Sequence, residues 1–554
     1  MSVETLGRMR RITLRLVAAV SLIAALAVVP GPASGADAYA GYINDHTYVQ
    51  TRYGSIYVQY WKPLRGRAPV LLSMSPYRYL YGYLDPTGRV DPMKDYYSNT
   101  YVPRGYARAY ADLLGTGYSD GCWDYGGAKE AEAGAAVVEW LAAQPWSTGK
   151  IGMIGTSYDG AIQLETATLA PPHLAAIVPQ EPVSSWYHYN YEAAVTHNST
   201  DDDVGLADTG YPIGTPDLFD LVLSRTPNTD PNRSPQAHAA NVADRASECE
   251  AIEHNYRGHI ADPSYGSFWQ ERDWSLRASR VRAAVLLQHG WRDSNTKPDQ
   301  FWRFWTALPP TLDKRVLLGR WNHTDVFAGA PSYATPPINS AKYLAAFLDV
   351  HLKGKSPTLL ARFPRILTEG SDEVWRTTLP AALRPTTWRF GEDASFVNSG
   401  METSKIFKNL PGGMATPAMA VWATPTFRKP ARIVGPGFVA ATTAVMGLRG
   451  QLDATLLDVD PSGAAKVLTL GLADLRYYED PAAPHSLEPG EAMSVRVRLR
   501  PIDAVVAAGH HLEVVLAGSE AMWGVPDPEV GQQYTLSHVT LSMPITTTGN
   551  VYRR

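Results

Sequence analysis

Residues 151–160 read I-G-M-I-G-T-S-Y-D-G, and they decide how the rest of the chain is interpreted. The apolar residues 151–154 predict a short buried strand, and the residues after this stretch predict a helix. Between the two, Gly155, Ser157 and Gly160 form the pattern G-x-S-x-G. A sharp turn from strand to helix that exposes a serine needs glycine on both sides, because a side chain there would collide with neighbouring elements. The stretch therefore predicts a nucleophilic Ser157.

Further strands and helices alternate around this stretch. Apolar strands are predicted at 69–74, 106–111, 175–179, 283–288 and 315–318, and helices at 128–143, around 300–306 and at 341–352. An edge hairpin is expected within 40–62. Strands that alternate with helices at this spacing favour a mostly parallel α/β sheet.

Two changes in amino-acid composition and pattern suggest the domain boundaries. The long connection at about 181–280 is rich in Tyr, Trp, Asp and Pro and is predicted to be a helical cap over the carboxyl ends of the strands. After residue 355, strands punctuated by Pro and Gly predict an all-β, jelly-roll-like domain. In the segment 493–500, Met and Val alternate with Ser and Arg, so the arginines are expected to face outward. We therefore expect an α/β domain at 36–355 and a β-sandwich at 356–554.

The N-terminus and the composition bound the cellular context. Arginines precede the apolar run Leu16–Val29, and small residues follow it, which predicts a secretory signal over residues 1–35 because the run is too short to span a membrane. The pair Arg10-Arg11 leaves a twin-arginine export route open. The net charge of −4 comes without a long basic block, so neither nucleic acid nor, once the signal is removed, a membrane is expected as a partner. We expect a secreted protein whose oligomeric state is open.

Cysteines and metal motifs say little about the chemistry. The two cysteines, Cys122 and Cys249, could form one disulfide in an oxidising compartment, and the alternative is two buried thiols. The chain contains no H-E-x-x-H motif and no paired-cysteine spacing, so we expect no metal and no cofactor.

A nucleophilic serine needs a histidine base, and the histidine needs an orienting carboxylate. Asp293 follows the predicted strand 283–288, and His323 follows the strand 315–318, so both should lie at the sheet edge that carries Ser157. Asp299 is a rival for the acid and His289 for the base. The oxyanion that develops needs hydrogen-bond donors. The backbone amide of Tyr158 is one candidate donor. Tyr77, at the end of the strand 69–74, is a second candidate, and the alternative is that its ring only packs.

Taken in order, several motifs resemble the X-Pro dipeptidyl-peptidase and cocaine-esterase-like family of α/β-hydrolase serine hydrolases. The motifs are Ser75-Pro76-Tyr77, the loop 112–122, the elbow 155–160, Ser184-Ser185-Trp186-Tyr187, Phe268-Trp269-Gln270-Glu271-Arg272, His289-Gly290-Trp291-Arg292-Asp293 and Gly319-Arg320-Trp321-Asn322-His323. In the β domain, Leu487-Glu488-Pro489-Gly490 and Gly509-His510-His511-Leu512 look like the family's C-terminal domain.

The resemblance implies an α/β-hydrolase fold with a helical cap and a C-terminal jelly roll. It also implies that Ser157 is the nucleophile, Asp293 the orienting acid and His323 the base, with Tyr77 and the Tyr158 amide as oxyanion donors. The cap and Asn295-Thr296-Lys297-Pro298 look closer to the X-Pro peptidase branch than to cocaine esterase. Asp159 departs from the family, which often has an apolar residue there.

A dipeptidyl-peptidase must also hold a free amine and a proline ring. Candidates for the amine are Glu192 and the run Asp201-Asp202-Asp203, and candidates for the ring are Trp186, Tyr187 and Tyr189.

Three functions are compatible with these residues. The first is release of Xaa-Pro dipeptides from peptide N-termini through an acyl-enzyme. The second is a carboxylesterase or acylase of the same fold. The third is a non-catalytic protein whose β domain binds carbohydrate.

Overall fold

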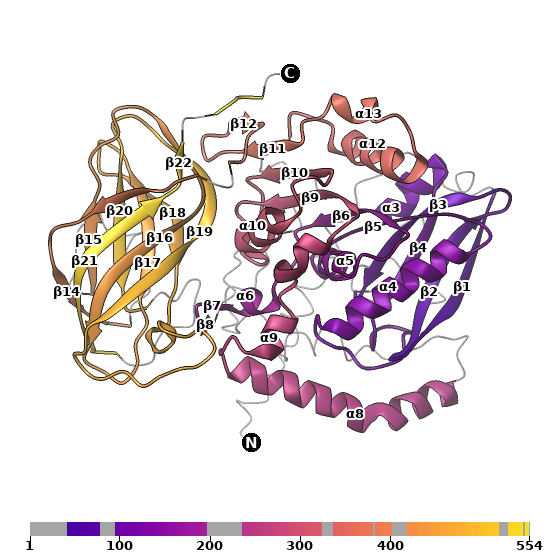
Figure 1. The fold of residues 1–554 in the computed structure, drawn as a ribbon, viewed down its shortest axis with the longest axis horizontal. Coiled ribbons are helices and arrows are strands. Elements are labelled where there is room, and N and C mark those ends of the chain that lie inside the picture. The colour runs from indigo at the N-terminus through magenta and orange to yellow at the C-terminus, as the bar shows by residue number, and fades with distance from the viewer. Residues whose placement is uncertain are drawn as a thin grey trace, which may run out of the picture.

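A computed structural model describes residues 41–77, 95–196, 235–323, 336–380, 383–400, 418–519, 530–546 and 549–552. The predicted signal, residues 1–35, and the acidic run Asp201, Asp202 and Asp203 lie outside these residues. Within them, an α/β unit packs against a separate β domain (Figure 1). No helix in the described ranges is both long and apolar enough to span a bilayer.

A mixed ten-stranded sheet forms the centre of the α/β unit, in the order β1-β2-β4-β3-β5-β6-β9-β10-β11-β12. Its strands are β1 (Tyr42–Thr51), β2 (Gly54–Pro63), β3 (Ala68–Ser75), β4 (Ala107–Asp112), β5 (Ser147–Thr156), β6 (Leu174–Gln180), β9 (Ala284–Gly290), β10 (Lys314–Gly319), β11 (Ile366–Glu369) and β12 (Trp375–Arg376). The pairs from β4 through β11 are parallel, and β1, β2 and β12 pair antiparallel at the two edges. The predicted α/β fold is confirmed, with each predicted strand present.

Helices cover both faces of this sheet, which explains its continuous apolar strands. Leu72 of β3 packs in the core shared with α4 and α5, whereas its neighbour Leu71 packs in the core shared with α12. The helices of this unit are α3 (Tyr96–Tyr101), η1 (Val102–Arg104), α4 (Ala128–Ala143), α5 (Tyr158–Thr168), α10 (Lys297–Ala307), α12 (Ser340–Lys353) and α13 (Thr358–Ala361). The helix predicted at 128–143 has the observed bounds, and the other two predicted helices differ from α10 and α12 only at their ends.

Between β6 and β9 the described residues are mainly helical. The elements are α6 (Trp186–Asn190), β7 (Tyr191–Glu192), β8 (Val195–Thr196), α8 (Pro235–Ala261), α9 (Ser267–Glu271) and η4 (Trp274–Arg280). A disulfide joins Cys249 of α8 to Cys122 in the loop before α4, so it ties this insertion to the α/β unit across 127 positions of sequence.

The β domain consists of two antiparallel sheets that enclose one apolar core. The larger sheet contains β13 (Thr386–Arg389), β14 (Ala394–Val397), β16 (Ala431–Val445), β19 (Met493–Val506), β21 (Gln533–Met543) and β22 (Ile545–Thr546). The smaller contains β15 (Met419–Ala423), β17 (Asp453–Val459), β18 (Ala465–Gly471) and β20 (His511–Ala517), and the short η5 (Leu475–Tyr477) follows β18. The predicted all-β domain is confirmed, and its jelly-roll topology stays a prediction.

Two sequence expectations about this domain need correction. The boundary at 355 is too early, because β11 and β12 belong to the α/β sheet and carry it to Arg376. Arg500 of β19 was expected to face outward but is buried, because it pairs with Glu192 of β7 at 2.7 Å.

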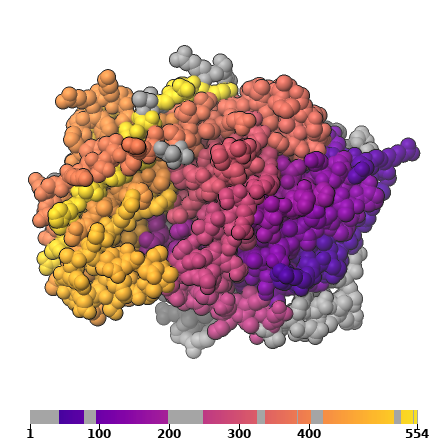
Figure 2. Space-filling view, viewed as in Figure 1, coloured from indigo at the N-terminus to yellow at the C-terminus, as the bar shows by residue number. Residues whose placement is uncertain are grey.

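The two domains meet in a contact that combines hydrogen bonds with apolar packing. Figure 2 shows the β domain, in orange and yellow, directly against the magenta part of the α/β unit. The β7–β8 hairpin reaches this contact: the amide of Asp474 donates to the carbonyl of Ala193, and Val195 packs on Leu470 and Leu472. The insertion that covers the strand ends is therefore held from both domains.

Candidate active site

Ser157 stands on the sharp turn between β5 and α5. Its backbone angles, φ 60° and ψ −122°, lie outside the helical and extended regions, which is a strained conformation for a serine. A Cβ on Gly155 would approach the Cβ of Asp159 to 2.5 Å, and one on Gly160 would approach the carbonyl of Gln180 to 2.8 Å. Only glycine fits at both positions, so the local sequence fixes the turn that presents the hydroxyl.

The structure brings Ser157, His323 and Asp293 into line. The His323 Nε2 atom lies 3.1 Å from the Ser157 Oγ, and its Nδ1 lies 2.9 Å from the Asp293 Oδ2. The amides of Asn295 and Thr296 donate to the other carboxylate oxygen of Asp293, and the Thr296 hydroxyl donates to Oδ2. Burial alone would raise the pKa of Asp293, but the positive charge that His323 can carry and the hydrogen bonds hold it well below its usual value. Asp293 is thus a fixed anion behind the imidazole.

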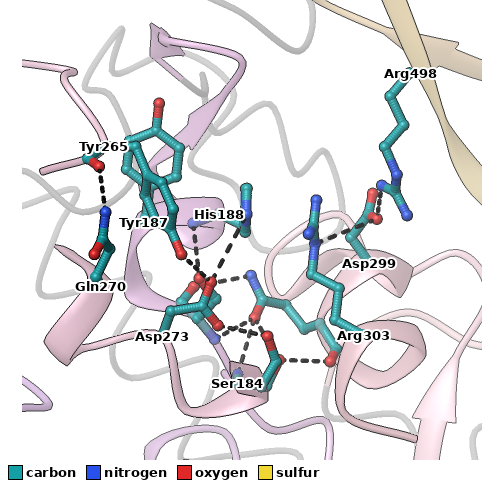
Figure 3. Close-up of polar contacts among 12 residues, drawn as sticks. Ser184, Tyr187, His188, Tyr265, Gln270, Asp273, Asp299, Arg303 and Arg498 are labelled. Atoms are coloured by element: carbon teal, nitrogen blue, oxygen red, sulfur yellow. Dashed lines mark hydrogen bonds and ion pairs between the residues drawn. The ribbon is translucent and has the colours of Figure 1, made fainter. Parts of the chain in front are cut away.

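The two rival residues occupy other places. Asp299 pairs with Arg498 of β19 (Figure 3). Its Oδ1 lies 3.8 Å from the Arg303 Nε. The His289 side chain is fully buried, and its Nε2 lies 3.8 Å from the Asp293 Oδ2. His289 therefore faces the acid and not the Ser157 hydroxyl. Burial lowers the pKa of His289 to about 4, so this imidazole is neutral at neutral pH.

Two donors converge beside the Ser157 hydroxyl. The Tyr77 hydroxyl lies 3.4 Å from the Ser157 Oγ, and the Tyr158 amide lies 3.4 Å from the Tyr77 hydroxyl oxygen. Burial raises the pKa of Tyr77 far above its usual value, so the phenol keeps its proton and can donate. Both groups are placed where a negatively charged oxygen formed next to Ser157 would accept their hydrogen bonds.

Replacing Tyr77 by phenylalanine tests this placement. The substitution keeps the ring and removes one donor, so kcat is expected to fall by about 100- to 1000-fold, as for loss of one oxyanion donor elsewhere. KM should change little, because the hydrogen bond strengthens as the oxyanion forms. Steady-state kinetics of Y77F and of Tyr110→Phe, a buried tyrosine of β4, compare the site with an ordinary phenol. Equal, small losses in both variants would show that Tyr77 only packs.

Buried acids beneath the elbow were missed by the sequence analysis. Glu130 of α4 accepts a hydrogen bond from the Tyr158 hydroxyl at 2.8 Å, and Glu165 of α5 accepts one from the Trp186 indole at 3.1 Å. Burial, with nearby Asp124, raises the pKa of Glu130 to about 8, and burial raises the pKa of Glu165 well above its usual value. The sequence analysis assigned neither residue a role. Together they anchor Tyr158 and the cap residue Trp186 to the α/β unit.

Glu181 was missed as well, although its position carried a signal. It follows β6 directly, Asp293 lies in the loop just after β9, and the carboxyl ends of parallel strands meet at one edge. Its Oε2 lies 3.8 Å from the His323 Nδ1. Donor atoms of Glu181, Asp293 and His323 lie within 4.8 Å of one another, which could hold a metal ion. Because His323 and Asp293 are hydrogen-bonded in line with Ser157, we interpret the group as acid–base machinery, and absence of a metal stays a prediction.

The predicted substrate residues separate into two groups. The Trp186 ring packs on the Tyr158 ring at 4.7 Å, and the Tyr189 hydroxyl donates to Asn295, two residues after Asp293. Both therefore lie beside the elbow and the acid loop. Tyr187 instead points into the cap, where its ring packs 4.7 Å from that of Tyr265 (Figure 3). Its hydroxyl donates to the carbonyl of residue 263.

Glu192 is not positioned as a simple amine anchor. Arg500 holds its carboxylate with contacts of 2.8 Å and 2.7 Å, so the charge is already compensated across the domain contact. The other candidates, Asp201, Asp202 and Asp203, lie outside the described residues.

Comparisons with known proteins agree with this architecture. Residues 55–325 match the model of the X-Pro dipeptidyl-peptidase (S15) family, and residues 414–551 match that of the X-Pro dipeptidyl-peptidase C-terminal non-catalytic domain. The chain is 27% identical to a Bacillus cereus protein named "Putative Xaa-Pro dipeptidyl-peptidase", covering 86% of this chain and 84% of that one.

Two solved structures show the same fold. One is a CocE/NonD family hydrolase from Staphylococcus aureus, with a TM-score of 0.69 at 17% identity, covering 91% of this chain and 94% of the other. The other is an alpha-amino acid ester hydrolase, with a TM-score of 0.65 at 18% identity, covering 94% and 99%. The chain belongs to the X-Pro dipeptidyl-peptidase (S15) family, has the α/β-hydrolase fold, and is an enzyme with hydrolase activity.

Proposed function

We propose that the protein hydrolyses its substrate through an acyl-enzyme on Ser157. The observation that carries the proposal is the line of hydrogen-bond distances from Ser157 through His323 to Asp293, with two donors beside the hydroxyl. His323 Nε2 takes the hydroxyl proton as the Ser157 oxygen attacks the substrate carbonyl, and Asp293 stabilises the imidazolium. The Tyr158 amide and the Tyr77 hydroxyl donate to the oxyanion.

The second half of the reaction uses the same groups. The imidazolium gives its proton to the leaving group, and the bond between that group and the acyl carbon breaks. Water then attacks the acyl-enzyme with His323 as base, and the acid product leaves as Ser157 regains its proton. Each step needs only the groups already in place.

For the substrate, we propose peptides with proline at the second position, from which an Xaa-Pro dipeptide is released. The family description and the names of the relatives support this choice. The rings of Trp186 and Tyr189 pack against one another beside the elbow, which makes them the candidates for contact with a proline ring. The carbohydrate-binding alternative falls away, because the chain belongs to a family of hydrolases.

A carboxylesterase or acylase remains the second candidate. The observation that favours it is the Glu192–Arg500 pair, which leaves this glutamate compensated rather than ready to receive a substrate amine. One protein of the same fold is named an alpha-amino acid ester hydrolase, so the fold is compatible with ester substrates.

Acetylation of the substrate amine separates the two candidates. With a Gly-Pro p-nitroanilide, N-acetylation is expected to lower kcat/KM by about 100-fold or more if the site pairs with the ammonium, because its polar partners are then left unpaired. Simple p-nitrophenyl esters serve as the comparison. Equal cleavage of the free and acetylated anilides, or cleavage of esters alone, would replace the peptidase with the esterase.

We also propose that the protein is exported. The arginines and the apolar run Leu16–Val29 support this location, as does the disulfide, which is stable in an oxidising compartment. N-terminal sequencing of the chain from the culture medium tests it, and an intact N-terminus on a chain retained inside the cell would contradict it.

A further inference from the structure

Glu181 occupies an unusual backbone position at the centre of the sheet edge. It follows β6, which lies between β5, the strand before Ser157, and β9, the strand before Asp293. Its amide donates to the carbonyl of Gln288 at 2.8 Å, and its φ of 45° is uncommon for a residue with a side chain. Strain of this kind persists where the surroundings impose it, often at functional sites. Here it accompanies a fully buried carboxylate directed toward the site.

His323 therefore has two carboxylates on the same ring nitrogen. The Nδ1 atom lies 2.9 Å from Asp293 Oδ2 and 3.8 Å from Glu181 Oε2. The first distance is a hydrogen bond, and the second is too long for one, so Glu181 can act on His323 only electrostatically, as a charged group near the ring. Both carboxylate side chains are fully buried, where such a charge is weakly screened.

Other titratable groups around the imidazole do not supply this charge. His289 of β9 is neutral at neutral pH, and Tyr77, after β3, keeps its proton. Lys297, at the start of α10, faces Asp293 from the cap side, and burial lowers its pKa to about 7. Beside Asp293, it is Glu181 that places a second carboxyl group near His323.

We propose that Glu181 is a positioning residue that acts through His323. Its carboxylate stabilises the imidazolium that forms when Ser157 gives up its proton, and it holds the ring on the line between Ser157 and Asp293. The proposal rests on the proposed function, in which His323 is the base. In this arrangement the base, His323, has two carboxylates near its Nδ1 atom, Asp293 and Glu181, instead of one.

The test is the pH dependence of kcat/KM with p-nitrophenyl acetate in Glu181→Gln, which keeps the size of the side chain and removes its charge. The substrate has no amine, so a loss cannot come from amine binding. The acid limb of the profile should move down by about one pH unit, since a lost anion makes the imidazole less basic. The plateau should fall roughly three- to tenfold with KM unchanged, because the base is weaker.

Matched variants keep the outcome unambiguous. Glu181→Asp retains the charge and should restore the acid limb to within a few tenths of a unit of the wild type. Glu132→Gln, a surface glutamate paired with Arg52, should leave the limb in place. If E181Q does not fold, Glu181→Met, an uncharged side chain of similar length, takes its place, and an unmoved limb in E181M would overturn the proposal.

Failure of this proposal is distinct from failure of the proposed function. An unmoved acid limb in folded E181Q, while Ser157→Ala is inactive, overturns the role of Glu181 only. Full activity of Ser157→Ala would instead remove the acyl-enzyme mechanism, and with it the base on which Glu181 is proposed to act.

Discussion

Ser157→Ala is expected to lower kcat by at least about 10,000-fold on every substrate that the enzyme hydrolyses, because no other group can form the acyl-enzyme. The His323 Nε2 lies 3.1 Å from this hydroxyl and would have no nucleophile to activate. Thermal unfolding should change little, since the side chain is small and only partly buried. Active-site titration with a fluorophosphonate, which labels the activated hydroxyl, gives an independent measurement.

A double variant sharpens this expectation. Residues that act as one unit are strongly non-additive, so Ser157→Ala combined with His323→Ala should be no slower than Ser157→Ala alone. If the loss of kcat in the double variant equalled the product of the losses in the two single variants, the two side chains would act independently. Residual activity of a tenth or more in the single Ser157 variant would place the nucleophile elsewhere.

Asp503→Ala is expected to destabilise the protein by about 3–5 kcal/mol, the usual cost of leaving a buried charge without its partner. Asp503 of β19 receives two hydrogen bonds from Arg432 of β16, at 2.7 Å and 2.6 Å, and both side chains are fully buried. The Thr368 hydroxyl of β11 also donates to Asp503 at 2.8 Å, so the pair joins the β domain to the α/β sheet.

This joint extends toward the acid loop of the site. The indole of Trp291, two residues before Asp293, donates to the Thr368 hydroxyl at 3.0 Å. Loosening of the domain contact in D503A should therefore lower activity at temperatures below the unfolding midpoint. Urea unfolding followed together with kcat measures both effects.

An exposed ion pair provides the control for Asp503. Glu132 pairs with Arg52 on the surface, where water screens both charges, so Glu132→Ala should leave the free energy of unfolding nearly unchanged. Asp503→Ala combined with Arg432→Met should recover part of the loss, because it removes the orphaned charge. Equal stability of D503A and E132A would show that the buried pair is not what holds the domains together.

The sequence was most informative where function depends on a few adjacent residues. The G-x-S-x-G turn and the ends of the strands at 283–288 and 315–318 were sufficient to select Ser157, Asp293 and His323, which the structure brings together. This worked because parallel strands in one sheet end at one edge, so the residue after each strand has a predictable place. The same argument applied to β6 would have selected Glu181.

Other features depended on partners far along the chain. The alternating pattern predicted that Arg500 faces outward, yet it is buried against Glu192, 308 positions away. The strand β11 belongs to the α/β sheet, although it follows the change in composition that suggested the domain boundary. Glu130 and Glu165, which the sequence did not single out, accept hydrogen bonds from Tyr158 and Trp186.

The sequence alone determined the periodic elements, the elbow and the order in which nucleophile, acid and base occur, because these follow from steric demands within a few residues. Tertiary structure decided which buried charges face one another: the second carboxylate at His323, the pairing of Glu192 with Arg500, and the joint at Asp503. The energy of a buried charge depends on which groups surround it in space, and only the strand order and the packing of the two domains set those neighbours.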